Sequence, residues 1–520
     1  MQKNLIVALV LSAVIYLIWF TYVVPPQKPQ LQNHEQVQSQ TVSSDSKSDK
    51  KGSAFEAKKV EISDSNYKET EKKIVQKDAL FELKNEKARY VFNSDLSLNS
   101  LYYQSPVETV DLIIDKNYPF LSVLSGLNYK KISEDTNSIT VLAKKDIEIV
   151  KNIVISKNND MNTLFLEFKN NTKNQYVIPP LELSIGPGLN TVKSEEKENT
   201  KLVRAIYSYQ KEGRKNPVIE KLSGNYNRND WLWAAMDNRY FLFAVMNDGM
   251  FDSIKYFDED VDGHNFPRIS LVTKEIAVPP MSTKKIGIKF YSGPKDYSLL
   301  KSFGNGLQLS VDFGFFAPLA KLFDSVLKYF YKLVHNYGVA IILLGLLVQI
   351  LMLPLSIKSY KAMAIMKKMQ PEMKSIQDRY KKDPQRMNME LMQLYKRYGA
   401  NPFSGCWPML IQIPIFFALF TTLRNSWNLH GAKFVFWIKD LSAKDPYYIL
   451  PLLMGALMFL QNYTTPQATT DKTQAAMMKW MPVIFTFMFL AFPSGLVIYW
   501  IVNSLFAIVQ NYYLRKTQKI

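Results

Sequence analysis

The chain has 520 residues, of which 47% are hydrophobic, and this allows a soluble domain together with a membrane region. Its formal net charge is +18, and because the basic stretches adjoin apolar runs, the charge favours an anionic membrane surface over nucleic acid as a partner. The single cysteine, Cys406, excludes an intrachain disulfide, and the sequence has neither a metal-binding histidine spacing nor a phosphate-binding glycine loop. We therefore expect no metal, no cofactor and no small-molecule substrate.

The N-terminal segment 1–24 contains the twenty-residue apolar run LIVALVLSAVIYLIWFTYVV, preceded by Lys3. Its length matches a membrane-spanning helix, and no small-x-small cleavage site follows it. We predict an uncleaved anchor, with a cleaved signal peptide as the alternative. Residues 25–60 are rich in Pro, Gln, Ser, Lys and Asp, which predicts a disordered linker.

Residues 61–300 show a hydrophobic period of two. Runs such as DIEIVKNIVIS, TLFLEFKN and RYFLFAVM are bounded by Asn, Asp, Gly or Pro. Many short strands separated by turn residues predict a large β-sandwich domain. Trp231, Trp233 and Tyr240 are compatible with a carbohydrate-binding shelf, but core packing is the favoured interpretation.

Residues 312–335 have the pattern of an amphipathic helix. The sequence APLAKLFDSVLKYFYKLV places Leu319, Phe323 and Phe330 on one face at helical spacing, and Lys321 and Lys328 on the other. This pattern is typical of a helix lying in the membrane interface, with a soluble core helix as the alternative.

Five further apolar runs predict membrane-spanning helices, which make six with the anchor. The loop after the first of these runs, residues 358–399, carries eleven Lys and Arg against four Asp and Glu. The positive-inside rule therefore predicts that this loop, both termini and the basic tail 514–520 are cytoplasmic, and that the β-domain is periplasmic. The runs cover about 337–357, 408–427, 447–463, 477–492 and 494–513.

The loop 358–399 is predicted to fold as a helical hairpin. A first helix over Ser356–Tyr380 is ended by the sequence KKDPQ, in which Asp383 suits an N-cap and Pro384 the first position of a second helix. Its methionines form either a seam between the two helices or a pliable surface for varied partners. The candidate docking residues for cytoplasmic partners are its cations Lys367, Lys368, Lys374, Arg379, Lys381, Lys382, Arg386, Lys396 and Arg397.

Several long motifs closely resemble the YidC family of membrane protein insertases. They are SVDFGFFAPL (310–319), NPFSGCWPMLIQIPIFFALF (401–420), DLSAKDPYYILPLLMG (440–455) and MPVIFTFMFLAFPSGLVIYWIVNS (481–504). The resemblance implies a polytopic α-helical inner-membrane protein whose five-helix insertase core (336–513) holds a hydrophilic groove, next to the periplasmic β-sandwich. It also implies a protein that is not an enzyme but inserts nascent membrane proteins, alone or with the Sec translocon, in contact with the ribosome, the targeting machinery and membrane lipids.

Polar residues within the apolar runs are the candidate groove residues. Gln349 lies inside GLLVQILMLPLSI, where an unpaired amide costs about 1–3 kcal/mol, and the last run places a polar stripe at helical spacing. By resemblance, Gln349 stands where relatives usually carry an arginine, Gln412 and Phe416 match third-span groove positions, and Trp500 matches the final-span aromatic residue. The alternative for each amide is a hydrogen bond between packed helices. The candidate groove residues are Gln349, Gln412, Phe416, Trp500, Asn503 and Ser504.

Two rival functions conflict with the sequence. Neither an ion-coupled transporter nor an intramembrane protease is expected, because the five C-terminal runs contain no Asp, Glu or His in their apolar interiors. The remaining alternative is an envelope assembly scaffold without insertase activity.

Overall fold

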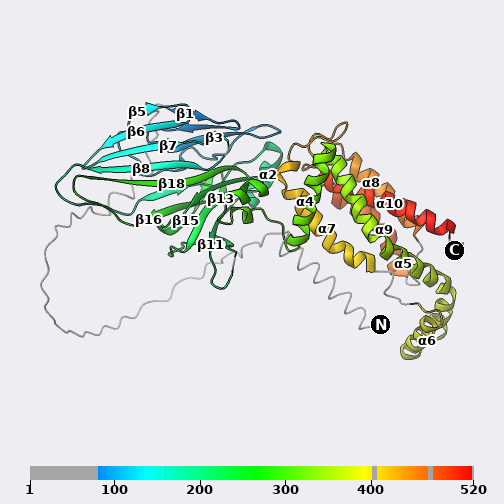
Figure 1. The fold of residues 1–520 in the computed structure, drawn as a ribbon. Helices are drawn as coiled ribbons and strands as arrows, with labels where there is room; N and C mark the ends of the chain where they lie inside the picture. Colours follow the sequence, from blue (N-terminus) through cyan, green and yellow to red (C-terminus); the bar gives the residue numbers. More distant parts are fainter. Residues whose placement is uncertain (1–79, 159, 215, 401–406, 466–471, 518–520) are drawn as a thin grey trace, which may run out of the picture. The chain divides into compact units, whose positions relative to one another are not determined.

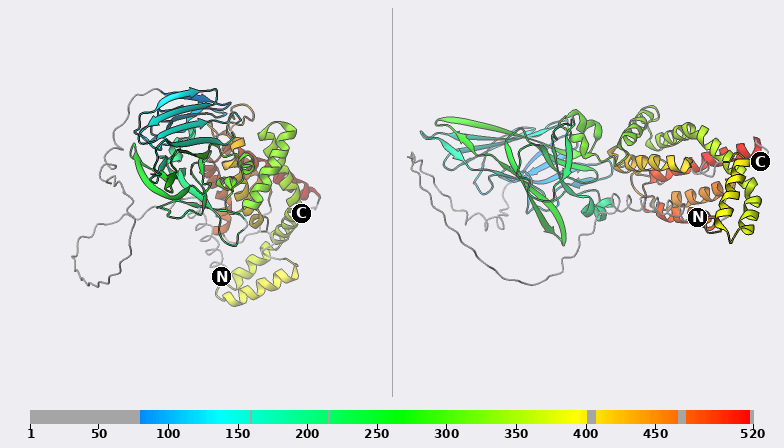
Figure 2. Two further views of the ribbon diagram at one scale, coloured as in Figure 1. Left: turned by 60° about the vertical axis from the view of Figure 1, so that its left-hand side comes forward. Right: turned by 90° about the horizontal axis from the view of Figure 1, so that it is seen from below.

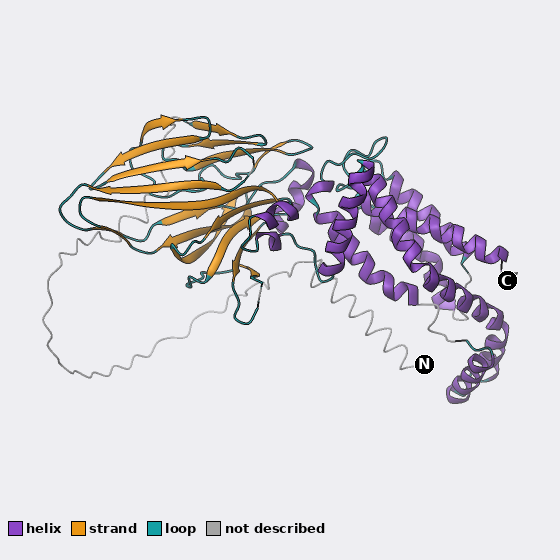
Figure 3. Ribbon diagram, in the orientation of Figure 1, coloured by secondary structure: helices purple, strands orange, loops and turns teal. Residues whose placement is uncertain are grey.

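The computed structural model describes residues 80–158, 160–214, 216–400, 407–465 and 472–517, which all belong to one compact unit. Strands make up the N-terminal part of this unit and helices make up its C-terminal part (Figure 1 and Figure 3). The predicted anchor (1–24), the linker (25–60) and the first residues of the predicted β-domain (61–79) lie outside the described residues.

The described β-domain is built from antiparallel strands joined mostly by short turns. The strands are β1 Phe81–Lys84, β2 Ala88–Phe92, β3 Leu98–Gln104, β4 Thr109–Asp111, β5 Lys130–Glu134, β6 Ser138–Lys144, β7 Glu148–Val154, β8 Asn162–Asn170, β9 Tyr176–Ile178, β10 Glu182–Ile185, β11 Arg204–Tyr209, β12 Val218–Lys221, β13 Trp231–Asp237, β14 Phe241–Met246, β15 Phe251–Val261, β16 His264–Thr273, β17 Ile276–Val278 and β18 Ser282–Pro294.

A nine-stranded sheet in the order β12-β11-β13-β14-β18-β8-β7-β6-β5 forms the centre of the domain. The smaller sheets β1-β2-β3-β4 and β10-β16-β15 pack against it. Tyr90 of β2 hydrogen-bonds Ser292 of β18 at 3.1 Å, and Trp231 of β13 stacks on Phe251 of β15 with ring centroids 5.7 Å apart. This is the β-sandwich that the period-two pattern predicts, since β8 (NTLFLEFKN) alternates buried and half-buried residues along its whole length.

The strand β14 is buried on both faces, which explains its uninterrupted apolar sequence FLFAVM. Phe241 and Phe243 belong to the sandwich core. Leu242 and Ala244 belong instead to a second core, which continues into the helical region and includes Phe323. The central sheet therefore supports two hydrophobic cores.

The aromatic residues near β13 are core residues, as the favoured interpretation predicts. Trp231 is 2% exposed, Trp233 is 0% exposed and Tyr240 is 1% exposed. Trp233 also donates from Nε1 to the carbonyl of Asn305 at 2.9 Å. None of these rings is available as a carbohydrate-binding shelf.

Each apolar run predicted between 337 and 513 contains a helix, although α7, α8 and α9 stop or start two or three residues inside the predicted bounds. Residues 356–379 are helical, as predicted, and they continue the preceding apolar run in one helix, α5, despite Pro354 and Pro371. The helices are α2 Glu196–Leu202, α3 Tyr297–Ser302, α4 Ala317–Val334, α5 Tyr337–Arg379, α6 Pro384–Arg397, α7 Trp407–Asn425, α8 Ile449–Thr464, α9 Lys472–Phe489 and α10 Ser494–Thr517.

Within the described residues, α5 and α10 are long and apolar enough to cross a membrane. Shorter apolar helical stretches cover Leu410–Asn425, Ile449–Thr464 and Lys479–Phe489. At 1.5 Å per residue, the sixteen residues of α8 extend only about 24 Å, which is less than the roughly 30 Å of a typical hydrocarbon core. The complete set of six spans stays a prediction.

The helix α4 has the apolar and the basic face that its sequence predicts. Part of the apolar face is buried against other helices and part of it is exposed. Ala320, Phe323 and Leu327 are buried where α4 packs on α5 and α7. Leu322 and Leu333 are 56% and 60% exposed. The exposed leucines leave apolar surface for a membrane, as an interfacial helix requires.

The hairpin consists of the end of α5 and the antiparallel helix α6, which lies beside it in Figure 2. Asp383 caps α6 by accepting from the Arg386 amide, and Pro384 occupies the first turn, so the predicted helix start is confirmed. Met369, Met373 and Leu394 form a buried cluster between the helices.

Candidate functional site

The polar residues of the helical region meet on α10. Gln349 of α5 is 9% exposed, and its Nε2 donates to Oδ1 of Asn503 on α10 at 2.5 Å. A Cβ added to Gly345 would lie 3.2 Å from Cγ1 of Val502, so the two helices approach closely one turn before this amide pair. Small residues at such crossings allow polar groups on membrane helices to reach each other.

A second polar contact joins α7 to α10. Nε2 of Gln412 donates to the Tyr499 hydroxyl at 3.1 Å. Tyr499 precedes Asn503 by four residues and therefore lies on the same face of α10. The sequence reasoning selected Gln412 but missed Tyr499, although the four-residue spacing was a usable signal.

Aromatic rings lie next to these amides. Trp500 contacts Phe416 of α7 with ring centroids 5.7 Å apart, and it contacts Phe485 and Phe489 of α9 at 5.6 and 5.2 Å. The structure thus brings Phe416 and Trp500 together, as their joint selection requires. The two rings therefore form an aromatic cluster with α9.

Further polar groups extend this face toward the end of α10. Oγ of Ser356 donates to Oε1 of Gln510 at 3.0 Å, and Gln510 follows Tyr499 by eleven residues, or about 16 Å along the helix. The last candidate, Ser504, is 1% exposed, and its hydroxyl has no hydrogen-bond partner among the described residues. The face therefore carries side chains that are already hydrogen-bonded, and the unsatisfied Ser504 hydroxyl lies beside it, one residue further along α10 than Asn503.

The candidate docking cations of the hairpin are all exposed. Most extend from α5 or α6 without burying their charge, although Arg397 lies 3.7 Å from Glu372 and Arg386 lies over the Tyr380 ring at 5.3 Å. Met389 and Met392 are 60% and 57% exposed. Both interpretations of the methionines thus have structural support, because some fill the helix seam and others remain on the surface.

A buried arginine connects the β-domain to the end of α7. Arg239 donates to the carbonyl of Arg424 at 3.0 and 2.8 Å and to Glu195 at 2.5 Å. The neighbouring Tyr240 hydroxyl hydrogen-bonds Ser442 at 3.0 Å. The Arg424 guanidinium lies 3.5 Å from Glu198, so this cation belongs to the junction and does not approach Gln349.

His430 lies in the same junction and is 2% exposed. Burial holds the pKa of its imidazole below the ordinary value of 6.5, although the Asp440 carboxylate opposes this shift. Nδ1 lies 3.6 Å from Oδ2 of Asp440, and the ring packs on Tyr240 with centroids 4.6 Å apart. The described residues contain no cluster of His, Cys, Asp or Glu that could hold a metal ion.

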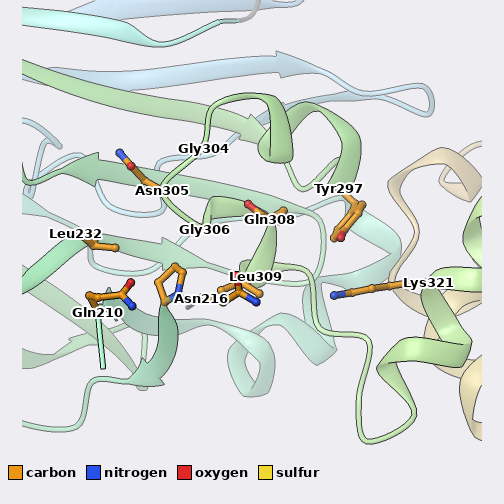
Figure 4. Close-up of a pocket in the computed structure, with 11 residues that line it drawn as sticks. Gln210, Asn216, Leu232, Tyr297, Gly304, Asn305, Gly306, Gln308, Leu309 and Lys321 are labelled. Carbon is orange, nitrogen blue, oxygen red and sulfur yellow. The ribbon is translucent and has the colours of Figure 1, made fainter. Parts of the chain in front are cut away.

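A cavity of about 600 Å³ lies elsewhere, between the edge of the central sheet and α4 (Figure 4). Amide side chains line it together with Tyr297 and Lys321, whose ammonium lies 5.4 Å from the Tyr297 ring centre. None of the candidate groove residues lines this cavity. We therefore place the candidate site on α10 and its neighbours.

Two family models match the chain: that of the 60Kd inner membrane protein over residues 329–520, and that of the YidC periplasmic domain over residues 125–325. The membrane protein insertase YidC of Endomicrobium trichonymphae is 36% identical over 531 residues, covering 100% of this chain and 99% of the relative. That of Syntrophus aciditrophicus is 46% identical over 288 residues, covering 55% of this chain and 52% of the relative.

A solved structure of an active YidC insertase with its first transmembrane domain resolved aligns with a TM-score of 0.40 and 20% identity, covering 84% of this chain and 93% of the other. The relatives and family models define an inner-membrane protein with a periplasmic β-sandwich domain and a helical C-terminal region. The chain belongs to the YidC family of membrane protein insertases. As a member of this family, the chain inserts nascent membrane proteins and is not an enzyme. The comparison with relatives thus confirms the resemblance seen in the sequence and the function expected from it.

Proposed function

We propose that client proteins enter the bilayer along the polar face of α10, between α5 and α7. The observation that carries this proposal is the pair of contacts Gln349–Asn503 and Gln412–Tyr499, which converge on one helix face. Phe416, Trp500 and Ser504 complete the groove. In the resting protein Gln349 is paired with Asn503 and Gln412 with the Tyr499 hydroxyl, and a passing polar segment replaces these partners one at a time.

Neutral amides suit this task because they exchange hydrogen bonds without burying a charge. A polar client tail that contacts them avoids part of the cost of crossing hydrocarbon. The client's apolar segment then moves into lipid and gains about 25 cal/mol per Å² of apolar surface removed from water. Partitioning of this kind needs no nucleotide.

We further propose that both termini and the hairpin are cytoplasmic. Ser442 of the loop after α7 hydrogen-bonds Tyr240 of the periplasmic domain. The start of α10 contacts the same loop, where the Ser494 amide donates to the Ala443 carbonyl at 2.8 Å. α5 also starts there, because Gly338 lies against Phe434. If α5 and α10 cross the membrane, both helices therefore end on the cytoplasmic side. We keep the six spans, the anchor included, and the domain division predicted from the sequence as part of this proposal.

The exposed cations of the hairpin are proposed to dock the ribosome and the targeting machinery, and the Sec translocon is a proposed partner within the membrane. Replacing Lys381, Lys382 and Arg386 by Gln should reduce insertion of ribosome-bound clients without changing the unfolding temperature, because all three side chains are exposed. The matched control replaces the exposed β-domain residues Lys116, Lys173 and Lys284. Equal activity of the two variants would contradict hairpin docking.

The groove is tested with purified protein in liposomes and a single-span client with an acidic tail. We expect insertion by the native chain and a lower rate after Ser504→Leu, which fills the polar face. Phe459→Ala on α8, where the native ring is 49% exposed, is the matched control and should insert normally. Normal insertion by Ser504→Leu would contradict this route, and a protein that inserts no client on its own would favour the assembly-scaffold alternative.

A further inference from the structure

The loop that joins α7 to α8 has an unusual surface. We call residues 432–448 the basic-aromatic loop. Its exposed apolar side chains are Val435 (43%), Phe436 (91%), Tyr447 (66%) and Tyr448 (41%). An almost fully exposed phenylalanine gains nothing from packing within the protein.

The backbone of the loop holds Phe436 outward at a cost. Phe436 has φ of 53°, a conformation that bulky residues rarely adopt. Hydrogen bonds from the Phe434 amide to the Ile438 carbonyl and from the Ile438 amide to the Val435 carbonyl, at 3.0 and 3.1 Å, close the turn around it. A strained turn that displays an apolar ring indicates a role outside the protein's own core.

The charges of this loop are sorted by sign. Lys433, Lys439 and Lys444 are exposed. Both carboxylates are turned inward: Asp445 accepts from the Trp437 indole at 3.0 Å and the Leu450 amide at 2.7 Å, and Asp440 accepts from Ser442 at 2.7 Å. The outer surface of the loop is therefore cationic and aromatic.

The aromatic surface is continuous with the exposed apolar side of α8. Phe436 stacks on Trp437 with ring centroids 6.0 Å apart, and Trp437 meets Tyr447 at 6.5 Å. The first turns of α8 then expose Ile449, Leu452 and Leu453 at 43%, 60% and 47%. In an inner-membrane protein, exposed leucines on an apolar helix face lipid, and aromatic residues at the end of such a helix lie at headgroup depth.

The geometry points to a lipid-binding surface: we propose that the basic-aromatic loop docks into the periplasmic leaflet. Phe436 and Tyr447 insert below the headgroups, and the three lysines bind the phosphates of anionic phospholipids. Because Ser442 of this loop hydrogen-bonds Tyr240 of the β-domain, the docked loop also sets the height of the periplasmic domain above the membrane. This role goes beyond client insertion and does not depend on the proposed groove.

Insertion depth is tested on the full chain with Cys406→Ser and a single new cysteine carrying a nitroxide. Labels are placed at Phe436, at Leu453 as the lipid control, and at Ile132, which is 57% exposed on β5, as the water control. In vesicles of phosphatidylethanolamine and phosphatidylglycerol, the label at 436 should collide with oxygen and be shielded from a water-soluble nickel complex, like the label at 453. Nickel accessibility equal to that at 132 would overturn the proposal and leave the surface to a protein partner.

Headgroup selectivity is tested by replacing Lys433, Lys439 and Lys444 with Gln. Binding of phosphatidylglycerol to the purified protein should weaken by about fivefold for each lysine removed, whereas binding of phosphatidylcholine should not change. The control triple variant of Lys116, Lys173 and Lys284 removes the same charge from the β-domain and should bind phosphatidylglycerol normally. Equal losses in the two triple variants would mean that only net charge attracts the lipid, and would overturn the site.

Discussion

The β-domain and the helical region bury their side chains in opposite ways. In the β-domain the large aromatic residues are inside, and Trp233 and Phe243 are 0% exposed. In the helical region, Leu351 of α5 and Phe487 of α9 are 69% and 70% exposed. Exposed apolar surface on this scale is unfavourable in water but neutral in lipid. The two regions are thus folded for different solvents.

Their buried polar groups differ as well. The β-domain buries charges, as in the cluster where Asp237 accepts from Arg204 at 2.8 Å and from Lys295 at 2.7 Å. The helical region pairs neutral amides, as in Gln349 with Asn503. Buried charge requires several fixed partners, whereas an amide can exchange one partner for another. The buried contacts of the β-domain are therefore charged and multiply paired, whereas those of the helical region are neutral and can be replaced at a lower electrostatic cost.

The largest expected effect is a loss of stability when a core side chain of the β-domain is truncated. Phe243→Ala should lower the free energy of unfolding of the β-domain by about 3–5 kcal/mol, because it leaves a cavity in a core that lipid cannot fill. Leu351→Ala should change stability little, since the native side chain already contacts lipid. Thermal unfolding of both variants in the same vesicles measures this difference in stability. Equal losses of stability would contradict the conclusion that the β-domain is packed in water and α5 in lipid.

The junction between the two regions gives the next effect. Arg239→Ala removes the partner of Glu195 and of the Arg424 carbonyl, which leaves buried polar groups unpaired and should cost about 3 kcal/mol. Arg228→Ala removes an exposed pair with Asp230 and should cost less than about 1 kcal/mol. Limited proteolysis of the loop after α7 reports the loss, and unchanged protection in Arg239→Ala would show that the regions are held by other contacts.

A smaller effect on stability, together with an effect on insertion, is expected at the amide pair of Gln349 and Asn503. Gln349→Leu should shift stability by less than about 1 kcal/mol, as interhelical hydrogen bonds in membranes are weak, but it should slow insertion of clients with acidic tails. Gln349→Arg should be accepted, because a charge survives there only if water or client reaches it. The double variant Gln349→Leu with Asn503→Leu separates the alternatives. Full activity of this variant would make the pair a packing contact, whereas a further loss supports the groove.

The smallest effect is a pH dependence at His430. Burial lowers the pKa of this imidazole below 6.5, so the unfolded chain binds a proton more readily than the folded one. Stability from this group is therefore present above about pH 6.5 and lost as pH falls through the folded-state pKa. His430→Phe should flatten the fall of unfolding temperature below about pH 6.5, whereas His264→Gln at an exposed position should not. An unchanged slope in His430→Phe would exclude this contribution.

Local features were predictable from the sequence, whereas partners distant in the sequence were not. The two-residue and 3.6-residue periods identified the strands and α4, and Asp383 with Pro384 identified the start of α6. The helical character of residues 356–379 was also predictable, whereas their continuity with the apolar run 337–357 in one helix, α5, was not.

The candidate site was likewise predictable only in part. The sequence identified the face of α10 that carries Asn503 and selected Gln349 and Gln412 as its neighbours, but it did not give the individual contacts or the part played by Tyr499. The contacts of Tyr499 with Gln412 and of Arg239 with Arg424 join residues far apart in the chain. Periodicity gives the face of an element and does not give its neighbour.

The proposed route of clients along α10, between α5 and α7, can be tested by photo-crosslinking. A benzophenone amino acid is placed at Phe416, beside Trp500 on this route, or at Phe459, on the exposed side of α8. A ribosome-bound client stalled during insertion is then irradiated. We expect strong crosslinks from position 416 and weak ones from 459, both in correctly folded protein. Crosslinks of equal strength, or stronger ones from 459, would contradict it.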